Sequence, residues 1–319
     1  MIAKGKFDSL PKFDWRMVSL TKFGVHLSGP VDDPRKFGEF CREIEEWGFD
    51  SVWLADGLTR SMPEPLPLLA CASTFTARIK LGTCIYVLPL RPPLVTAKLT
   101  ATLDRLSRGR FVFGVGVGWR EDEFKAVGIP FSKRGKAADE CLQIIRQAWT
   151  RGTVNFQGDF FNITGVRMEL QPEQKPSPPI WVGGNGKAAA FRAARFADCW
   201  IPTDYTVGEY EQGRTLLTQA CSSVDREPNE IETASHLMVI VDESKNEAAQ
   251  LAKEVAVSLH EKVEDLLKWT IVGDFKEVAR RLDEYNAAGV DYHVLNFATK
   301  VRDEKRIELF AREVMPSFK

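Results

Sequence analysis

Short apolar runs alternate with longer amphipathic stretches along most of the chain. The short runs predict buried strands, and the stretches with apolar residues three and four positions apart predict helices. In the first such helix, Asp33 supplies the N-cap, Pro34 occupies the first turn and Gly48 ends the helix. The predicted strands cover residues 22–27, 51–55, 80–88, 111–117, 180–183, 199–202, 236–241 and 291–297.

Each predicted strand is followed by a predicted helix, and eight such units close naturally into a (β/α)8 TIM barrel of the α/β class. A doubly wound open sheet is the alternative, but eight units in one chain saturate a barrel. The alternation is interrupted at residues 153–171, where a strand-like pattern around Gly158 predicts an inserted β-hairpin. We predict one domain over residues 1–319, with an N-terminal extension at residues 1–21.

Charge and composition exclude several classes of function. The chain has 43 basic and 44 acidic residues, mixed along its length, which argues against nucleic-acid binding. The six cysteines are widely separated and the four histidines form no ligand motif, so we expect no metal and no disulfide framework. No apolar run is long enough for a membrane span and the N-terminus lacks a signal-peptide core, so we expect a cytoplasmic protein without membrane partners.

Candidate chemistry lies where the predicted strands end, because barrel enzymes build their sites at that edge. The fourth strand has glycine at every other position (Gly114, Gly116 and Gly118) before Trp119. Glycine packs no side chain, so this alternation indicates a surface that a flat group or another backbone approaches closely. After the fifth strand, residues 183–187 (GGNGK) open a helix with free backbone N–H groups, which suits a phosphate.

Several motifs together resemble the bacterial luciferase-like superfamily of flavin- and coenzyme F420-dependent oxidoreductases. They occur between about residues 22 and 205 in the order and spacing of that family: WGFDSVWLAD, LGTCIYVLPLRPP, AKLTATLDRLSRGR, GVGVGWREDEFKAVG, the pair Arg134 and Glu140, and PPIWVGGNGKAAAFRAARFADCW. The resemblance implies a (β/α)8 barrel, a phosphate site at residues 183–187 and a non-prolyl cis peptide bond at Cys84–Ile85. The cofactor-binding residues that it implies are Asp56, Cys84, Ile85, Gly116, Val117, Gly118, Trp119, Gly183, Gly184, Asn185 and Gly186.

The chain departs from this family at one chemically important position. Many F420-dependent relatives have a histidine directly after the aspartate that ends the second strand, but here Gly57 follows Asp56. The nearest substitute as a proton donor is His26, close to the end of the first strand. We therefore expect His26 to be the catalytic residue.

The resemblance implies an oxidoreductase that uses reduced coenzyme F420 for hydride transfer to a small organic substrate. An FMNH2-dependent monooxygenase and a catalytically silent flavin-binding protein remain the alternatives. We expect a homodimer. F420 carries an anionic tail, which must leave the barrel mouth past basic side chains. The candidates for this contact are Arg91, Arg120, Lys187 and Arg192. Residues able to line an apolar substrate pocket are Trp53, Tyr86, Trp119, Trp200 and His236.

Overall fold

A computed structural model describes residues 21–297 and 304–318. Within these ranges eight parallel strands close a barrel, as predicted. The circle closes because the last strand pairs with the first and the seventh pairs with both of its neighbours. The barrel strands are β1 (Lys22–Leu27), β2 (Ser51–Leu54), β3 (Lys80–Thr83) with its continuation β4 (Tyr86–Val87), β5 (Phe111–Gly116), β8 (Ile180–Gly183), β9 (Cys199–Ile201), β10 (Glu232–Val241) and β12 (Tyr292–Phe297).

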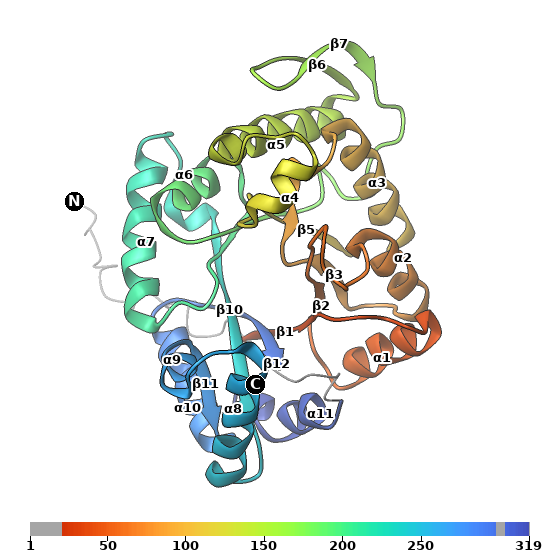
Figure 1. Cartoon of the computed structure of the whole chain (residues 1–319). Coiled ribbons are helices and arrows are strands. Elements are labelled where there is room, and N and C mark those ends of the chain that lie inside the picture. Colours follow the sequence, from red (N-terminus) through yellow and green to blue (C-terminus); the bar gives the residue numbers. More distant parts are fainter. Residues whose placement is uncertain (1–20, 298–303, 319) are drawn as a thin grey trace, which may run out of the picture.

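Helices surround the strands on all sides (Figure 1). They are α1 (Pro34–Glu46), α2 (Pro65–Phe75), α3 (Pro93–Leu106), α4 (Glu121–Ala126), α5 (Arg134–Arg151), α6 (Gly186–Phe196), α7 (Val207–Ser222), α8 (Lys245–Leu259), α9 (Val263–Trp269), α10 (Phe275–Ala287) and α11 (Glu304–Glu313). Among the described residues, none of these helices combines the length and the apolar composition that a membrane-spanning segment requires.

Apart from strand ends that differ by one residue, the predicted strands differ from the observed ones in three places. The third strand is not continuous, since a bulge at Cys84–Ile85 separates β3 from β4. The seventh begins at Glu232 rather than at residue 236, because its polar first residues pair with β9. A further short strand, β11 (Thr270–Gly273), extends the outer half of β10 and was not predicted.

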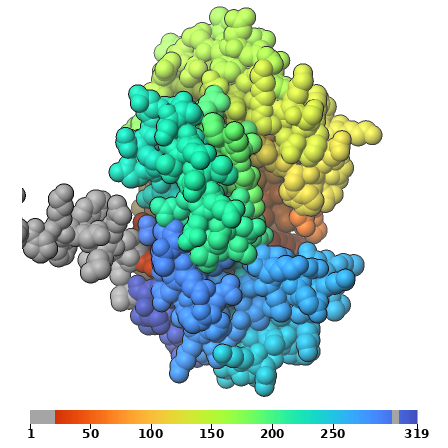
Figure 2. All heavy atoms as spheres, turned by 90° about the vertical axis from the view of Figure 1, so that its left-hand side faces the viewer, coloured from red at the N-terminus to blue at the C-terminus, as the bar shows by residue number. Residues whose placement is uncertain are grey.

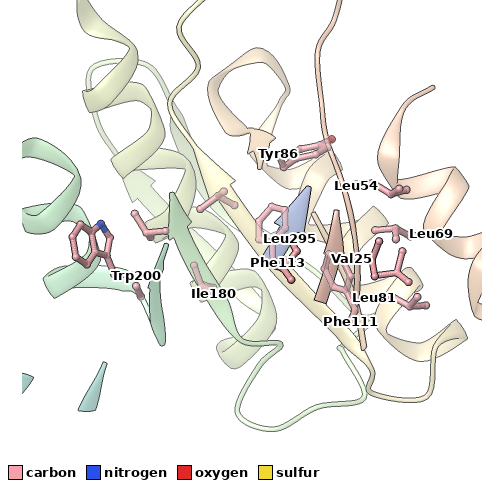
Figure 3. Packing of buried hydrophobic residues seen from close by; sticks show 14 of the residues in the cluster. Val25, Leu54, Leu69, Leu81, Tyr86, Phe111, Phe113, Ile180, Trp200 and Leu295 are labelled. Carbon is pink, nitrogen blue, oxygen red and sulfur yellow. The ribbon is translucent and has the colours of Figure 1, made fainter. Parts of the chain in front are cut away.

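The core has two parts. Between the strands and the surrounding helices lies the larger apolar layer, in which Val25, Leu81 and Leu69 pack together (Figure 3). The barrel interior holds a smaller cluster around Trp53 and Trp181, whose rings lie 4.5 Å apart. Because side chains alternate along a strand, Val25 on the helix side of β1 places His26 on the interior side.

The predicted hairpin insertion is confirmed as the antiparallel pair β6 (Thr153–Gln157) and β7 (Asn162–Arg167). Glu140 of α5 holds its turn by accepting hydrogen bonds from the backbone N–H groups of Asp159, Phe160 and Phe161. The predicted N-terminal extension, residues 1–21, lies outside the described residues apart from Thr21.

Candidate functional site at the carboxyl end of the barrel

The Cys84–Ile85 bulge rests on the glycines of two neighbouring strands. The peptide bond between these residues is cis, as the family resemblance implied. A Cβ atom on Gly114 would lie 1.8 Å from the Thr83 carbonyl oxygen, and one on Gly116 would lie 2.0 Å from Cδ1 of Ile85. A Cβ on Gly183 would also meet the Ile85 side chain, at 2.5 Å. The group that approaches these glycines closely is thus the bulge itself, through the Thr83 carbonyl at Gly114 and the Ile85 side chain at Gly116 and Gly183.

A second feature of this edge is the N-terminus of α6, which lacks a side-chain cap. Its N-cap residue Asn185 directs its amide to the backbone N–H and C=O of Thr203 instead. Within the described ranges, the N–H groups of Lys187 and Ala188 in the first turn have no hydrogen-bond acceptor. Both residues are exposed, so the positive end of this helix is open to an anion.

The segment after β9 holds the loop in front of α6 in place. The hydroxyl of Tyr205 accepts a hydrogen bond from the N–H of Gly186, and the indole of Trp200 donates to the Gly184 carbonyl. Gly184 has φ of +122°, a conformation that strains any residue with a side chain. The loop is therefore fixed by backbone conformation and by neighbouring residues before any ligand is bound.

Two histidines from strands far apart in the sequence meet inside the barrel. Nε2 of His236 lies 3.0 Å from Nδ1 of His26, so one of these nitrogens donates a hydrogen bond to the other. The remaining nitrogens, Nε2 of His26 and Nδ1 of His236, are buried and have no hydrogen-bond partner among the described residues. Nδ1 of His236 lies 4.0 Å from a carboxylate oxygen of Asp204.

Burial determines the protonation states of the two histidines and of the neighbouring Asp204 and Cys84. Burial and the neighbouring His236 lower the pKa of His26 well below the ordinary value. The Cys84 backbone acts in the opposite direction, which places His26 beside the bulge. Burial also lowers the pKa of His236 to about 4 and, with Glu261, raises that of Asp204 to about 7. It raises the pKa of the Cys84 thiol to about 12. At neutral pH both histidines are neutral, and the Cys84 thiol is protonated and is not a nucleophile.

The other predicted cofactor residues lie at the same edge with different surroundings. Asp56 follows β2, and only 2% of its side chain is exposed because Arg91 and the N–H of Val87 bind both carboxylate oxygens. Val117, Gly118 and Trp119 follow β5, and Trp119 is 72% exposed. Direct contact of these residues with a cofactor stays a prediction. In this structure Asp56 binds the backbone N–H of Val87 at the end of β4.

The structure also shows where the predicted pocket residues and the basic candidates lie. Trp200 does not line a pocket at the mouth, since it packs in the layer between strands and helices. Tyr86 lines an apolar pocket, but this pocket lies outside the barrel, between α2 and α3. Of the basic candidates, Arg91 is bound by Asp56 and Arg192 by Asp139, and Arg120 contacts Asp122. Lys187 lies over the Phe191 ring and, within the described part of the chain, has no carboxylate partner.

Sequence reasoning placed His236 near a pocket but missed that it binds His26, and it gave Asp204 no role. The signal lay in the alternation along β10, where Ala234 faces the barrel interior and Leu237 faces the helices. His236 therefore points inward, as His26 does on β1. The pairing itself required knowing that β1 and β10 lie on opposite sides of β12.

The space-filling view shows a hollow at this end of the molecule (Figure 2). It lies between the yellow atoms of the α4 segment and the blue atoms of the C-terminal third, and orange atoms of the first third are visible at its bottom. Since α4 follows β5, this hollow opens on the edge where the parallel strands finish. The bulge, the open end of α6 and the histidine pair thus share one end of the barrel.

This arrangement matches a known family. The family model described as luciferase-like monooxygenase matches residues 14–268. The chain belongs to this family. It is a luciferase-like oxidoreductase. Over 330 aligned residues it is 28% identical to the F420-dependent glucose-6-phosphate dehydrogenase of Kineococcus radiotolerans, covering 92% of this chain and 96% of that protein.

Solved structures show the same fold. An F420-dependent secondary alcohol dehydrogenase in complex with an F420–acetone adduct has a TM-score of 0.82 at 20% identity, covering 94% of this chain and 99% of that one. The oxygenating constituent of 3,6-diketocamphane monooxygenase from Pseudomonas putida, in complex with FMN, has a TM-score of 0.77 at 17% identity, covering 93% and 98%. At these identities the structures establish the fold and leave the cofactor open.

Proposed function

We propose that this chain is an F420-dependent oxidoreductase that transfers a hydride between the cofactor and a small organic substrate, with His26 as the proton donor. The observation that carries the proposal is that the open N-terminus of α6 and Nε2 of His26, which has no hydrogen-bond partner among the described residues, occur at the same end of the barrel. The first suits an anionic cofactor and the second suits an acid–base group. The F420-dependent relative at 28% identity supports this choice of cofactor.

The residues present fit a phosphate-bearing cofactor. The N–H groups of Lys187 and Ala188 would bind its phosphate. Gly184 lies against this first turn, since a Cβ on it would lie 3.3 Å from the Cβ of Ala189. The Cys84–Ile85 bulge would support the ring system. When bound, reduced F420 would supply the hydride, which is chemistry that no side chain of the protein offers.

His26 would handle the proton that accompanies the hydride. Its Nε2 is buried and has no partner in the described part of the chain. The ring is neutral at pH 7, so Nε2 holds a proton in one tautomer and accepts one in the other. Cys84 takes no part in proton transfer at this pH because its thiol pKa is about 12. The Cys84 side chain fills space beside the interior cluster instead.

An FMN-dependent monooxygenase is the second candidate, favoured by the structural likeness to an FMN-bound monooxygenase. F420 differs from FMN in carrying an anionic tail beyond the phosphate, and Lys187 is the candidate to meet it. Binding of each cofactor, measured by fluorescence titration at low and high salt, separates the two. We expect F420 to bind more tightly, with an advantage that shrinks as salt screens the charges. Tighter binding of FMN, with oxygen consumption in the presence of a reductant, would reject F420.

The phosphate site is tested by the substitution Gly184→Glu, which should abolish cofactor binding because a carboxylate would repel the anion and block the helix end. Gly165→Glu in the hairpin is the matched control, since Gly165 also has positive φ and a Cβ there meets nothing within 4 Å. Loss of binding in both variants, or in neither while circular dichroism shows folded protein, would count against this site.

A further inference from the structure

The histidine pair continues into a third group that links it to solvent. Asp204 follows β9 and lies 4.0 Å from Nδ1 of His236, while its side chain is 34% exposed. His236 in turn contacts His26 at 3.0 Å, and both histidines are buried. The three side chains thus form a line from the surface to Nε2 of His26. A small rotation of the Asp204 carboxylate would close the remaining gap, as apo sites often require.

The backbone holds Asp204 in this position. Its N–H donates to the His236 carbonyl, and the N–H of His236 donates to the Pro202 carbonyl, so the β9 exit is fixed to β10. Asp204 has φ of +55°, in the left-handed region that asparagine and aspartate tolerate better than most residues. The neighbouring Thr203 and Tyr205 hold the loop before α6. One short segment therefore supports both the proposed phosphate loop and the histidine pair.

We propose that Asp204, His236 and His26 form a proton relay between solvent and the mouth of the barrel. This rests on the proposed role of His26 as proton donor. Before the transfer Asp204 is protonated, and His236 and His26 each carry their proton on Nε2. When His26 gives up that proton, Nε2 of His236 passes one to Nδ1 of His26, and Asp204 passes one to Nδ1 of His236.

The balance of this step fits the electrostatics of the site. One proton leaves at Nε2 of His26, Asp204 becomes a carboxylate, and both histidines are neutral before and after. No buried imidazolium is needed, which agrees with the lowered pKa of each ring. Solvent then restores the proton on Asp204, whose pKa of about 7 suits both directions of transfer. Both imidazoles must also return from the Nδ1–H to the Nε2–H tautomer before the next transfer.

The titratable groups facing Asp204 come from several elements. His236 lies on β10, Glu261 follows α8, Cys84 lies in the bulge and Tyr285 lies on α10. The pKa values of Cys84 and Tyr285 are both raised to about 12, so these two side chains stay neutral near pH 7. Glu261 is the neighbour whose charge opposes ionisation of Asp204.

The relay predicts that both histidines exchange tautomers as Asp204 ionises. In cofactor-free protein labelled with 15N-histidine, NMR should show Nε2–H on His26 at low pH and Nδ1–H at high pH, with a midpoint near 7. Asp204→Asn should remove this switch, and Glu261→Gln should move its midpoint to lower pH. His293 is the internal control, because Asn286 fixes the proton on its Nε2. A switch that persists unchanged in Asp204→Asn would overturn the proposal.

Turnover provides the second readout. Asp204→Asn and His236→Phe should each lower kcat about tenfold or more and remove the ionisation near pH 7 from the pH profile, while the cofactor dissociation constant stays within about twofold. An unchanged kcat and pH profile in both variants would reject the relay. If neither cofactor binds the wild type but the tautomer switch is present, the proposed function fails and the relay stands.

Discussion

The barrel contains two buried histidine sites that look alike by burial and differ in hydrogen bonding. His293 on β12 is buried, and burial lowers its pKa to about 3. Its Nδ1 lies 2.8 Å from the Ser235 hydroxyl and its Nε2 lies 2.8 Å from the side-chain oxygen of Asn286, so both nitrogens are satisfied. In the His26–His236 pair each ring has one buried nitrogen without a partner among the described residues.

This difference separates a structural histidine from a chemical one. Burial and a lowered pKa occur at both sites, so neither property identifies function. A buried polar atom without a partner costs stability and therefore needs a reason, such as a ligand or a transferred proton. The unpartnered atoms of the pair lie at the end of the barrel where such a ligand would bind, whereas His293 stacks on Phe23 in the outer layer.

The largest expected effect follows from the substitution His26→Gln. Loss of the imidazole removes the proposed acid–base group, so kcat should fall by roughly 100- to 10,000-fold, the usual contribution of general acid–base catalysis. Cofactor affinity should stay nearly constant, because the phosphate site lies on α6. Steady-state kinetics and cofactor titration measure both. Near-normal kcat would make His26 another structural histidine.

The substitution His293→Leu should show the opposite profile. It leaves the Ser235 hydroxyl and the Asn286 amide without their partner, which should reduce the free energy of unfolding by about 2–4 kcal/mol. The folded enzyme should keep its kcat and its cofactor affinity. Urea unfolding and kinetics on the same preparation measure these quantities. A large fall in kcat with unchanged stability would erase the distinction between the two sites.

The pH dependence of stability gives a smaller effect. A histidine whose folded-state pKa is lowered stabilises the protein fully above its unfolded value of about 6.5, and this contribution is lost as pH falls towards the folded pKa. For His293 that window runs from about 6.5 down to about 3. Stability in His293→Leu should fall less steeply on acidification, by up to about 1.4 kcal/mol per pH unit. Equal slopes in variant and wild type would show that His293 is not buried as described.

The sequence was sufficient for the barrel, the hairpin insertion and the bulge, since each depends on local pattern or a family motif. The alternating glycines predicted that another group approaches this strand closely, but only the structure shows that the Ile85 side chain fills the space above Gly116. The histidine pair depends on register across three strands, because His26 lies opposite Asn296 on β12, which itself lies beside Met238 on β10. Such a contact between residues 210 positions apart leaves no local pattern.

The most direct test of the account is an NMR titration of 15N-histidine-labelled protein with F420, with His26→Gln and His293→Leu used to assign the signals. If the pair is the chemical site, the ring nitrogens of His26 and His236 should shift as the cofactor saturates, while those of His293 stay fixed. Shifts confined to His293, or no shift of the pair at saturating cofactor, would contradict the account.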